Sequence, residues 1–542
     1  MIKANLLGNW KSGLTVSLVS IPLAIALAIA SGATPTQGII TAFWAGLFGA
    51  IFGGSRYNII GPTGAISGIL ISYAILNGYE TLPVIAILSG LMILVSYLFH
   101  LDKYIIFIPR SVIHGFTLGV AFIIGLGQLD NALGIQGLPK TESILHNTYQ
   151  TLLNINSAEW VVFAVFGVCV AFIFLWNKRF PKIPGAVIAA FAGIICILIF
   201  EAAGIEHSMV TLGDKYPDLK GTLFTNITPH ISLDMFLNRE IWLISMATAI
   251  IAILETLLSG QIADQMTKTK FNRQKEVFGL AVANIASGVM GGIPATAALA
   301  RTSLNVKSGA GHKTSGIINA IFVGIISLFL LNYFKAIPIA VIAAILVIVA
   351  IGMVERKHFI HLIENERTAF LLSMLVAIVV VVEDPIFGIL AGTFIALLIF
   401  VNRVSYGQTE ILIWKDGKMI EAVLKNEFIK KEPYESDIIV YKISGTLTYI
   451  NMPAHLEAVE KIKQNDYIII SLRHAFYADI DGIDYLKEII EVLKKNNKTV
   501  LLAGVNEEIK KSIYKEDFYT QKLIENKIYK RTSEALKDIL KK

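Results

Sequence analysis

Long apolar runs separated by short polar segments dominate the chain up to about residue 409. A membrane-spanning helix needs about 20 mostly apolar residues. We therefore predict about fourteen spans, at residues 12–31, 36–53, 59–76, 82–100, 105–127, 159–176, 184–203, 241–262, 276–292, 294–307, 315–333, 337–353, 368–383 and 385–402. They divide into two sets of seven, which predicts inverted repeats over about 12–203 and 241–402 within a membrane domain of residues 1–409.

Helix breakers interrupt the third and the tenth span, the same ordinal position in each half. The two interruptions read Ile60-Gly61-Pro62-Thr63-Gly64-Ala65 and Ile293-Pro294-Ala295-Thr296-Ala297. Because proline blocks continuation of a preceding helix, each break predicts a half-helix that starts near the bilayer midplane. A helix N-terminus attracts anions, and two such starts in the two halves are typical of a secondary transporter.

The pattern changes near residue 410. A hairpin signal, Asp416-Gly417, lies between two apolar stretches, and short buried strands at 438–443, 467–472 and 500–503 alternate with helical patterns at about 453–464, 482–496, 506–514 and 532–541. This alternation predicts a small α/β domain over residues 410–542.

The composition indicates that the first part of the chain lies in lipid and the second part in water. The chain is 54% hydrophobic and 16% charged, with a mean hydropathy of +0.64. Residues 1–409 hold 24 Lys and Arg and 19 Asp and Glu, whereas the much shorter 410–542 holds 23 and 22. The net charge of +6 is spread along loops and predicts no nucleic-acid surface. With only two cysteines, Cys169 and Cys196, a disulfide scaffold or a cysteine-rich metal site is not expected.

Loop charges predict the orientation of the membrane domain. With the N-terminus inside, eighteen Lys and Arg flank the inner ends of the spans and five lie in outer loops, at Lys140, Lys215, Lys220, Arg239 and Lys335. Both termini are then cytoplasmic, in a multi-pass protein of the cell (inner) membrane. The long outer loops at about 128–158 and 204–240 carry no recognisable chemistry.

Glu255 lies deep inside the eighth span, and Ser259 shares its helix face four residues later. A carboxylate at this depth usually marks an ion path. One reading is that Glu255 and Ser259 hold a coupling proton or Na⁺. The other is that Glu255 satisfies backbone N–H groups freed by the two breaks. No other metal site is expected, because the histidines form no ligand-like spacing.

Three further residues lie at the breaks. Arg301 follows the second break and either supplies positive charge to an anion, pairs with Glu255, or reaches to the inner surface. Thr63 and Thr296 stand at the half-helix starts, where each either donates a hydrogen bond to an oxyanion or caps its helix. The sequence contains no P-loop, nucleophile elbow or HExxH motif, so neither ATP-driven transport nor enzyme activity is expected, and no cofactor.

Several of these motifs together resemble the SulP family of anion transporters, and the likeness covers nearly the whole chain. They are Gly61-Pro62-Thr63-Gly64, Glu255-Thr256-Leu257-Leu258-Ser259, Ala263-Asp264, Gly291-Gly292-Ile293-Pro294 and Ala300-Arg301. The C-terminal region resembles a STAS domain. The resemblance implies a fourteen-span fold split into core and gate domains, an elevator-like movement of the core and a homodimer.

Carried over by position, the resemblance implies an anion site formed by Thr63, Gly64, Thr296, Ala297, Ala298 and Arg301. Glu255 and Ser259 match positions that contribute to a cation site in Na⁺-dependent bicarbonate members, which tend to have Asp where this chain has Glu255. H⁺ coupling is therefore an alternative to Na⁺. In some STAS domains a phosphorylated Ser or Thr precedes a helix-starting glycine, but here Asp481 precedes Gly482. We expect a cytoplasmic protein partner for this domain rather than a phosphoswitch.

The expected function is secondary transport of a small inorganic oxyanion such as sulfate or bicarbonate. A dicarboxylate or nucleobase carrier of the same fold remains an alternative, although a larger substrate should require more polar side chains than the breaks supply. An anion channel, or a membrane scaffold whose STAS domain signals, is a second alternative from a different class.

Overall fold

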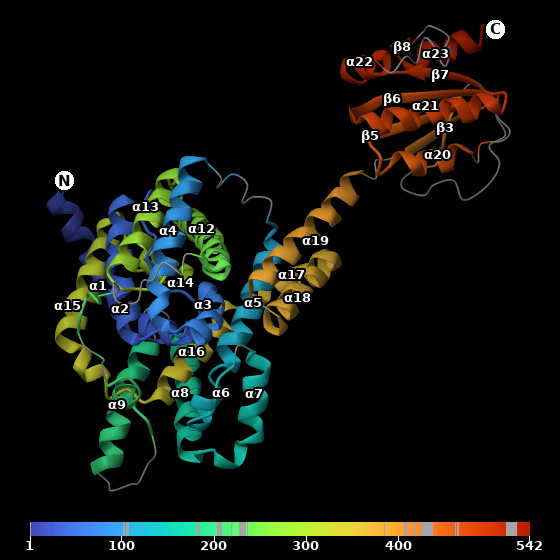
Figure 1. Cartoon of the computed structure of the whole chain (residues 1–542). Helices are drawn as coiled ribbons and strands as arrows, with labels where there is room; N and C mark the ends of the chain where they lie inside the picture. The colour runs from blue at the N-terminus through green and yellow to red at the C-terminus, as the bar shows by residue number, and fades with distance from the viewer. Residues whose placement is uncertain are drawn as a thin grey trace. The chain divides into compact units, whose positions relative to one another are not determined.

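The computed structural model describes residues 2–100, 103, 108–141, 143–180, 185–202, 209–217, 219, 221–226, 235, 237–383, 385–405, 409–415, 418–423, 437–460, 462, 466–515 and 528–541. The chain forms two compact units, Met1–Ala396 and Leu397–Lys542 (Figure 1). The division falls within one helix, α19, slightly before the domain boundary expected near residue 410. Each unit is described by itself.

The first unit is helical, and its elements follow the expected spans one by one. The first half contains α1 (Ile2–Ala30), α2 (Pro35–Phe52), β1 (Ile60–Gly61), α3 (Gly64–Asn77), η1 (Tyr79–Thr81), α4 (Leu82–Leu98), α5 (Arg110–Leu126), α6 (Leu129–Leu133), α7 (Ile144–Leu153), η3 (Ile155–Ser157), α8 (Trp160–Arg179) and α9 (Gly185–Ala202). Pro22 lies inside the continuous helix α1.

The second half repeats this order. After α10 (Leu212–Lys215), which lies between the two halves, it contains α12 (Arg239–Thr267), α13 (Arg273–Val289), β2 (Thr296–Ala297), α14 (Leu299–Lys307), α15 (Thr314–Phe334), α16 (Ile339–Met353), α17 (Arg356–Asn365), α18 (Arg367–Val382) and α19 (Pro385–Ser405). Among the described residues nine helices are long and apolar enough to cross a membrane, and 64–77, 185–200 and 367–382 form shorter apolar helices. This is a polytopic helical membrane protein.

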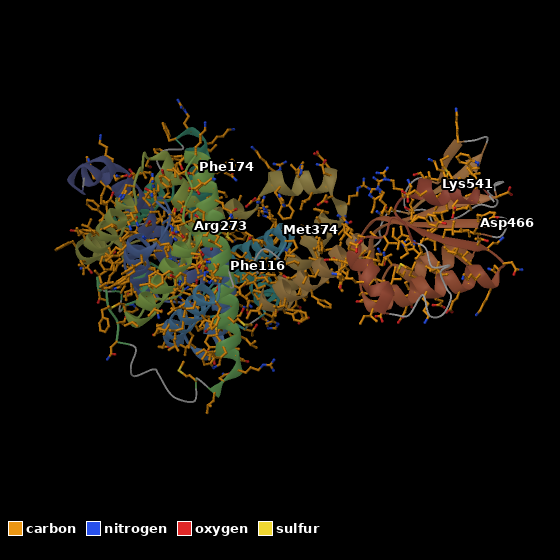
Figure 2. All side chains as sticks on the ribbon, turned by 90° about the horizontal axis from the view of Figure 1, so that it is seen from above. Phe116, Phe174, Arg273, Met374, Asp466 and Lys541 are labelled. Atoms are coloured by element: carbon orange, nitrogen blue, oxygen red, sulfur yellow. The ribbon has the colours of Figure 1, made fainter. Side chains whose placement is uncertain are left out.

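Side-chain burial in this unit is that of a protein surrounded by lipid. Its interior is built from small and branched residues such as Ala24, Ile25 and Ile345, which let helices approach closely. Large apolar side chains also cover the outside: Phe174 is 57% exposed and Phe394 63%, whereas Phe116 is buried (Figure 2). In water such a surface would aggregate, so it indicates contact with lipid.

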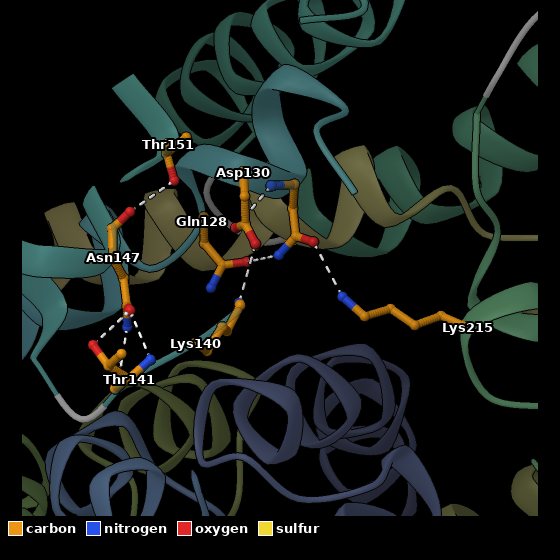
Figure 3. Close-up of polar contacts among 8 residues, drawn as sticks. Gln128, Asp130, Lys140, Thr141, Asn147, Thr151 and Lys215 are labelled. Atoms are coloured by element: carbon orange, nitrogen blue, oxygen red, sulfur yellow. Dashed lines mark hydrogen bonds and ion pairs between the residues drawn. The ribbon is translucent and has the colours of Figure 1, made fainter. Parts of the chain in front are cut away.

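The loop after α5 contains the two short helices α6 and α7, which the sequence did not predict. An ion pair and hydrogen bonds stabilise this loop, as Figure 3 shows. Lys140 pairs with Asp130 at 3.1 Å, Lys215 donates to Asn131 at 3.2 Å, and the Asn147 side chain accepts from and donates to the Thr141 backbone at 2.8 and 2.7 Å. These contacts join the two short helices and the segment between them.

The second unit is the expected α/β domain. One six-stranded sheet has the order β4-β3-β5-β6-β7-β8, with parallel pairing from β5 to β8 and antiparallel pairing of β3 with β4 and β5. Its strands are β3 (Thr409–Lys415), β4 (Lys418–Val423), β5 (Ile438–Leu447), β6 (Tyr467–Ala478), β7 (Thr499–Ala503) and β8 (Ile528–Tyr529). The expected turn residues 416–417 lie outside the described residues, and β8 was not predicted.

Helices pack on both faces of this sheet. They are α20 (Met452–Glu460), α21 (Ile480–Lys495), α22 (Glu507–Lys515) and α23 (Thr532–Ile539). Ile439 and Ile470 belong to one apolar core with residues of α20, α21 and α22, whereas Val440 and Ile469 belong to another with residues of α23. Asp479 caps α21 by accepting the Gly482 N–H at 2.6 Å. Acidic residues therefore start this helix, as expected.

Candidate functional site

The two interrupted segments meet inside the helical unit. β1 and β2 pair antiparallel, with Ile60 opposite Ala297 and Gly61 opposite Thr296. Helix α3 starts directly after β1, and α14 starts directly after β2. The prediction of two half-helices is therefore confirmed, with one correction. The residues before each start pair as extended strands, so the breaks do not interrupt helix on both sides.

Neither half-helix is capped by a side chain. Thr63 occupies the N-cap position of α3 in an extended conformation but makes no cap hydrogen bond. Its hydroxyl instead donates to Glu255 Oε2 at 2.9 Å. The N-cap of α14 is Ala298, which has no polar side chain to offer. Since the first N–H groups of a helix lack intrahelical partners, both starts present donors to whatever lies in front of them.

The second strand is fixed against α12 by its own polar groups. The Thr296 hydroxyl lies 3.2 Å from the Ala252 carbonyl and 3.1 Å from the Thr256 hydroxyl. The Ala297 N–H donates to Thr256 Oγ1 at 3.1 Å, and the Ala298 N–H donates to the Ile59 carbonyl at 3.1 Å. These two N–H groups already have protein partners, so the helix donors without an intrahelical partner begin at Leu299.

Arg301 is buried beside the first break. Its side chain is 1% exposed, which excludes the expected alternative of reaching the inner surface. Nη2 donates to the Pro62 carbonyl, while Nε and Nη1 have no hydrogen-bond partner among the described residues. A Cβ at Gly61 would lie 2.7 Å from Nη1, so a glycine is needed where β1 passes the guanidinium.

Glu255 brings the opposite charge to the same place. Among the described residues it forms no direct ion pair with Arg301, although the two charges act on one another and Thr296 also interacts with the carboxylate. Ser259 lies one turn further along α12, and its buried hydroxyl has no partner in the described part of the chain. The structure therefore brings together Thr63, Glu255 and Arg301, from three separate helices.

Sequence reasoning missed Glu276, which is 1% exposed at the start of α13. Its carboxylate accepts the N–H groups of Gly54 and Ser55 at 2.7 and 2.6 Å and the Asn58 amide at 2.7 Å. The Asn58 amide also donates to the Thr256 carbonyl at 3.1 Å. These bonds fix the segment that leads into β1. The sequence analysis placed Glu276 only at the start of the span expected at 276–292.

Asn284 does the same for β2. Its amide donates to the Ala295 carbonyl at 2.9 Å and accepts the Ala295 N–H at 2.8 Å. The Thr41 hydroxyl accepts the Ile293 N–H at 2.7 Å. In lipid every backbone polar group needs an internal partner, and these side chains provide one for the non-helical backbone. Polar residues inside apolar spans were the available signal.

Comparison with known proteins agrees with this architecture. Residues 6–376 match the model of the sulfate permease family, and residues 431–535 match the STAS domain. The chain is 30% identical over 511 residues to the Bacillus subtilis protein named "Putative sulfate transporter YvdB", covering 93% of this chain and 92% of the relative. It is 27% identical to the bicarbonate transporter BicA of Synechocystis, covering 98% and 94%.

Solved structures agree as well. The structure of SLC26A9 has a TM-score of 0.82 with 14% identity and covers all of this chain and 91% of its own, a likeness of fold alone. The transmembrane domain of the cyanobacterial bicarbonate transporter BicA has a TM-score of 0.61 with 25% identity, covering 72% of this chain and 97% of its own. This chain is a member of the sulfate permease (SulP) family, with a C-terminal STAS domain.

Proposed function

We propose that this protein is a secondary active transporter of a small inorganic oxyanion, sulfate or bicarbonate, coupled to H⁺ or Na⁺. Its relatives include named sulfate and bicarbonate transporters. The observation that carries the proposal is the buried guanidinium of Arg301, with unpartnered nitrogen atoms, beside two uncapped helix starts.

Anion binding follows from the donors at this place. The N-terminal ends of α3 and α14 each contribute a partial positive charge, and Arg301 adds a full one. Thr63 and Gly64 form the start of α3, while Thr296, Ala297 and Ala298 form the wall on the other side. These side chains are small, which favours an ion of a few heavy atoms over a dicarboxylate or a nucleobase.

Coupling is assigned to Glu255 with Ser259. An ionised carboxylate within a membrane domain is costly unless it is compensated, and an anion arriving next to it adds repulsion. A proton on Glu255 removes that repulsion, so anion and proton bind together. Na⁺ bound between the carboxylate and the Ser259 hydroxyl would act in the same way, and the experiment below distinguishes the two ions.

The remaining features follow from the loop charges and the resemblance to the family. We place both termini in the cytoplasm of a cell-membrane protein, because Lys and Arg gather at one set of loops. Substrate movement by an elevator-like shift of a core domain, a homodimer and a cytoplasmic protein partner for the STAS domain belong to the same proposal.

Uptake into proteoliposomes tests it. Radiolabelled sulfate and bicarbonate are offered with an inward proton gradient, an inward Na⁺ gradient or neither, to the wild type, Glu255→Gln and Arg301→Lys. We expect uptake of at least one anion by the wild type, its dependence on one gradient to disappear in Glu255→Gln, and weak uptake in Arg301→Lys. Ser245→Ala is the matched control, because this buried hydroxyl lacks a partner in the described residues. Equal uptake by all variants would refute the site.

A further inference from the structure

A polar cavity lies at one end of the helical unit, outside the site described above. Its volume is about 630 Å³, and its described lining consists of Gly8, Asn9, residues 53–56, Lys275, Gly309 and residues 311–313. This described lining contains glycine and polar or basic side chains, with no aliphatic side chain and no acid, and its one aromatic ring is the imidazole of His312. By the orientation proposed above, this end faces the cytoplasm.

Four basic side chains converge on the cavity: Arg56, Lys275, His312 and Lys313. Burial lowers the pKa of His312, and the neighbouring charges of Lys313 and Arg56 lower it further. The pKa of Lys313 is also lowered, by burial and by Lys275. The charges of Arg56, Lys275 and Lys313 are thus close enough to be felt at His312 or at one another, and an anion bound among them would reduce that repulsion.

One acid, Glu276, acts electrostatically on Lys313 and raises its pKa against the lowering by burial and by Lys275. Glu276 directs its carboxylate to the backbone of Gly54 and Ser55 and to Asn58 and does not line the cavity. Lys313 donates one hydrogen bond to the Ile51 carbonyl at 2.7 Å, which fixes its position and leaves two ammonium hydrogens.

The backbone of the cavity is preformed. Asn9 Oδ1 accepts the N–H groups of Gly311 and His312 at 2.7 and 3.2 Å, which ties the loop after α14 to α1. A Cβ at Gly309 or Gly311 would have no atom within 4 Å, so the space beside these glycines is open. A ligand would therefore meet side-chain cations on a surface whose backbone is held by hydrogen bonds.

We propose that this cavity binds a phosphate ester of a polyol, held through its phosphate by Arg56, Lys275 and Lys313. Pockets for small molecules usually measure about 300–1,000 Å³, so this cavity exceeds the needs of a bare sulfate or bicarbonate ion. A lining without aliphatic side chains offers no surface to an acyl chain, whereas its amide, hydroxyl and backbone groups suit the hydroxyl groups of a polyol. Guanidinium and ammonium groups recognise phosphate oxygens.

The position of this cavity connects it to the anion site. One wall, residues 53–56, leads into β1 by way of Asn58, and the other, 309–313, follows α14 directly. A ligand that contacts both walls would hold the segment that leads into β1 against the segment that follows α14. It is thus placed to regulate transport without contacting the transported anion.

Ligand binding to the full chain tests the proposal independently of transport. The protein is placed in nanodiscs of phosphatidylcholine, and its Tm is measured against glucose 6-phosphate, with sulfate at matched ionic strength as the comparison. A second arm replaces part of the lipid with phosphatidylglycerol, which presents the same chemistry from the bilayer. The double variant Arg56→Gln/Lys275→Gln is compared with Lys178→Gln/Arg179→Gln, which removes equal charge from the end of α8, outside the cavity lining.

We expect saturable stabilisation of the wild type by one of the two probes, binding at least about tenfold weaker in Arg56→Gln/Lys275→Gln, and unchanged binding in the control. Stabilisation by glucose 6-phosphate identifies a free ligand, and stabilisation by phosphatidylglycerol identifies a lipid headgroup. If Arg56→Gln/Lys275→Gln weakens stabilisation by sulfate as much as stabilisation by glucose 6-phosphate, if neither probe distinguishes the two double variants, or if neither probe binds, the proposal is wrong. Stabilisation by sulfate that is equal in both double variants belongs to the anion site and leaves the cavity proposal standing. Lys275→Gln alone, an exposed change, replaces a double variant that fails to fold.

Discussion

Substituting Gly61 with alanine should inactivate the anion site while leaving the fold intact. The new Cβ would lie 2.7 Å from Arg301 Nη1 and 3.3 Å from both Cζ and Nη2, and these are its three nearest atoms. A non-bonded contact of this kind relaxes at about 3.5 Å, so the guanidinium must withdraw by about 1 Å. It would then leave the Pro62 carbonyl and the two helix starts.

The size of the effect follows from this displacement. Only the end of a flexible side chain has to move, so we expect the free energy of unfolding to fall by about 1 kcal/mol. A charged group misplaced by about 1 Å can lower a rate on the order of a hundredfold, and kcat/KM for anion uptake should fall by that order. Uptake into proteoliposomes measures kcat/KM for the anion, and thermal unfolding measures the change in stability.

Gly352→Ala is the matched control, because a Cβ there has no neighbour within 4 Å. It should transport like the wild type. If Gly61→Ala transports at the wild-type rate while Arg301→Lys does not, the proposed link between the glycine and the position of the guanidinium is refuted. If Gly61→Ala unfolds, the clash is borne by the backbone and the reasoning about a flexible side chain is wrong.

Three further predictions concern the anion site and the STAS domain. Thr63→Val removes the hydroxyl that donates to Glu255 and should lower anion uptake about tenfold or more. Thr248→Val, at a buried hydroxyl that has no partner among the described residues, should leave uptake unchanged. Equal uptake by the two variants would exclude a role for Thr63. Burial lowers the pKa of His455 to about 4, whereas in the unfolded chain it is about 6.5, so the unfolded chain binds a proton that the folded domain excludes. The contribution of His455 to stability should therefore fall by about 3 kcal/mol as the pH drops from about 6.5 to about 4. Hydrogen exchange of β5 and α20, corrected for intrinsic rates, should show this loss in the wild type, and His455→Gln should lack it. Gly482→Ala places a Cβ 2.1 Å from the Leu447 carbonyl oxygen and should lower the unfolding temperature of the STAS domain in a thermal melt, with an unchanged melt contradicting the close approach.

Much of the membrane fold could be predicted because the bilayer constrains it so strongly. A run of about 20 apolar residues has few alternatives to a helix in lipid, and Pro62 and Pro294 mark where helix cannot continue. The pairing of Ile60 with Ala297 could not be predicted, since a strand of two residues has no detectable period. The helices α6 and α7 were missed for the opposite reason, because polar loop sequence carries no apolar run.

The sequence predicted which residues belong to the site better than it predicted the hydrogen bonds between them. The depth of Glu255 in an apolar span indicated its importance, but its hydrogen bond with Thr63 depends on how three helices meet. Glu276 was only the first residue of the span expected at 276–292, and its distances to the Gly54 and Ser55 N–H groups reveal its role. The sequence also does not show that a Cβ on Gly46 or Gly49 would press on Ile60 of β1, because that contact joins two separate elements.

The opposite charges of Glu255 and Arg301 make the empty centre electrically neutral when both are ionised. A monovalent anion that enters with one proton leaves it neutral again, so that cycle would move no net charge and would be indifferent to membrane potential. A divalent anion with one proton would carry one negative charge across, and a potential of 100 mV would then add or remove about 2.3 kcal/mol. The voltage dependence of uptake would therefore report the valence of the cargo.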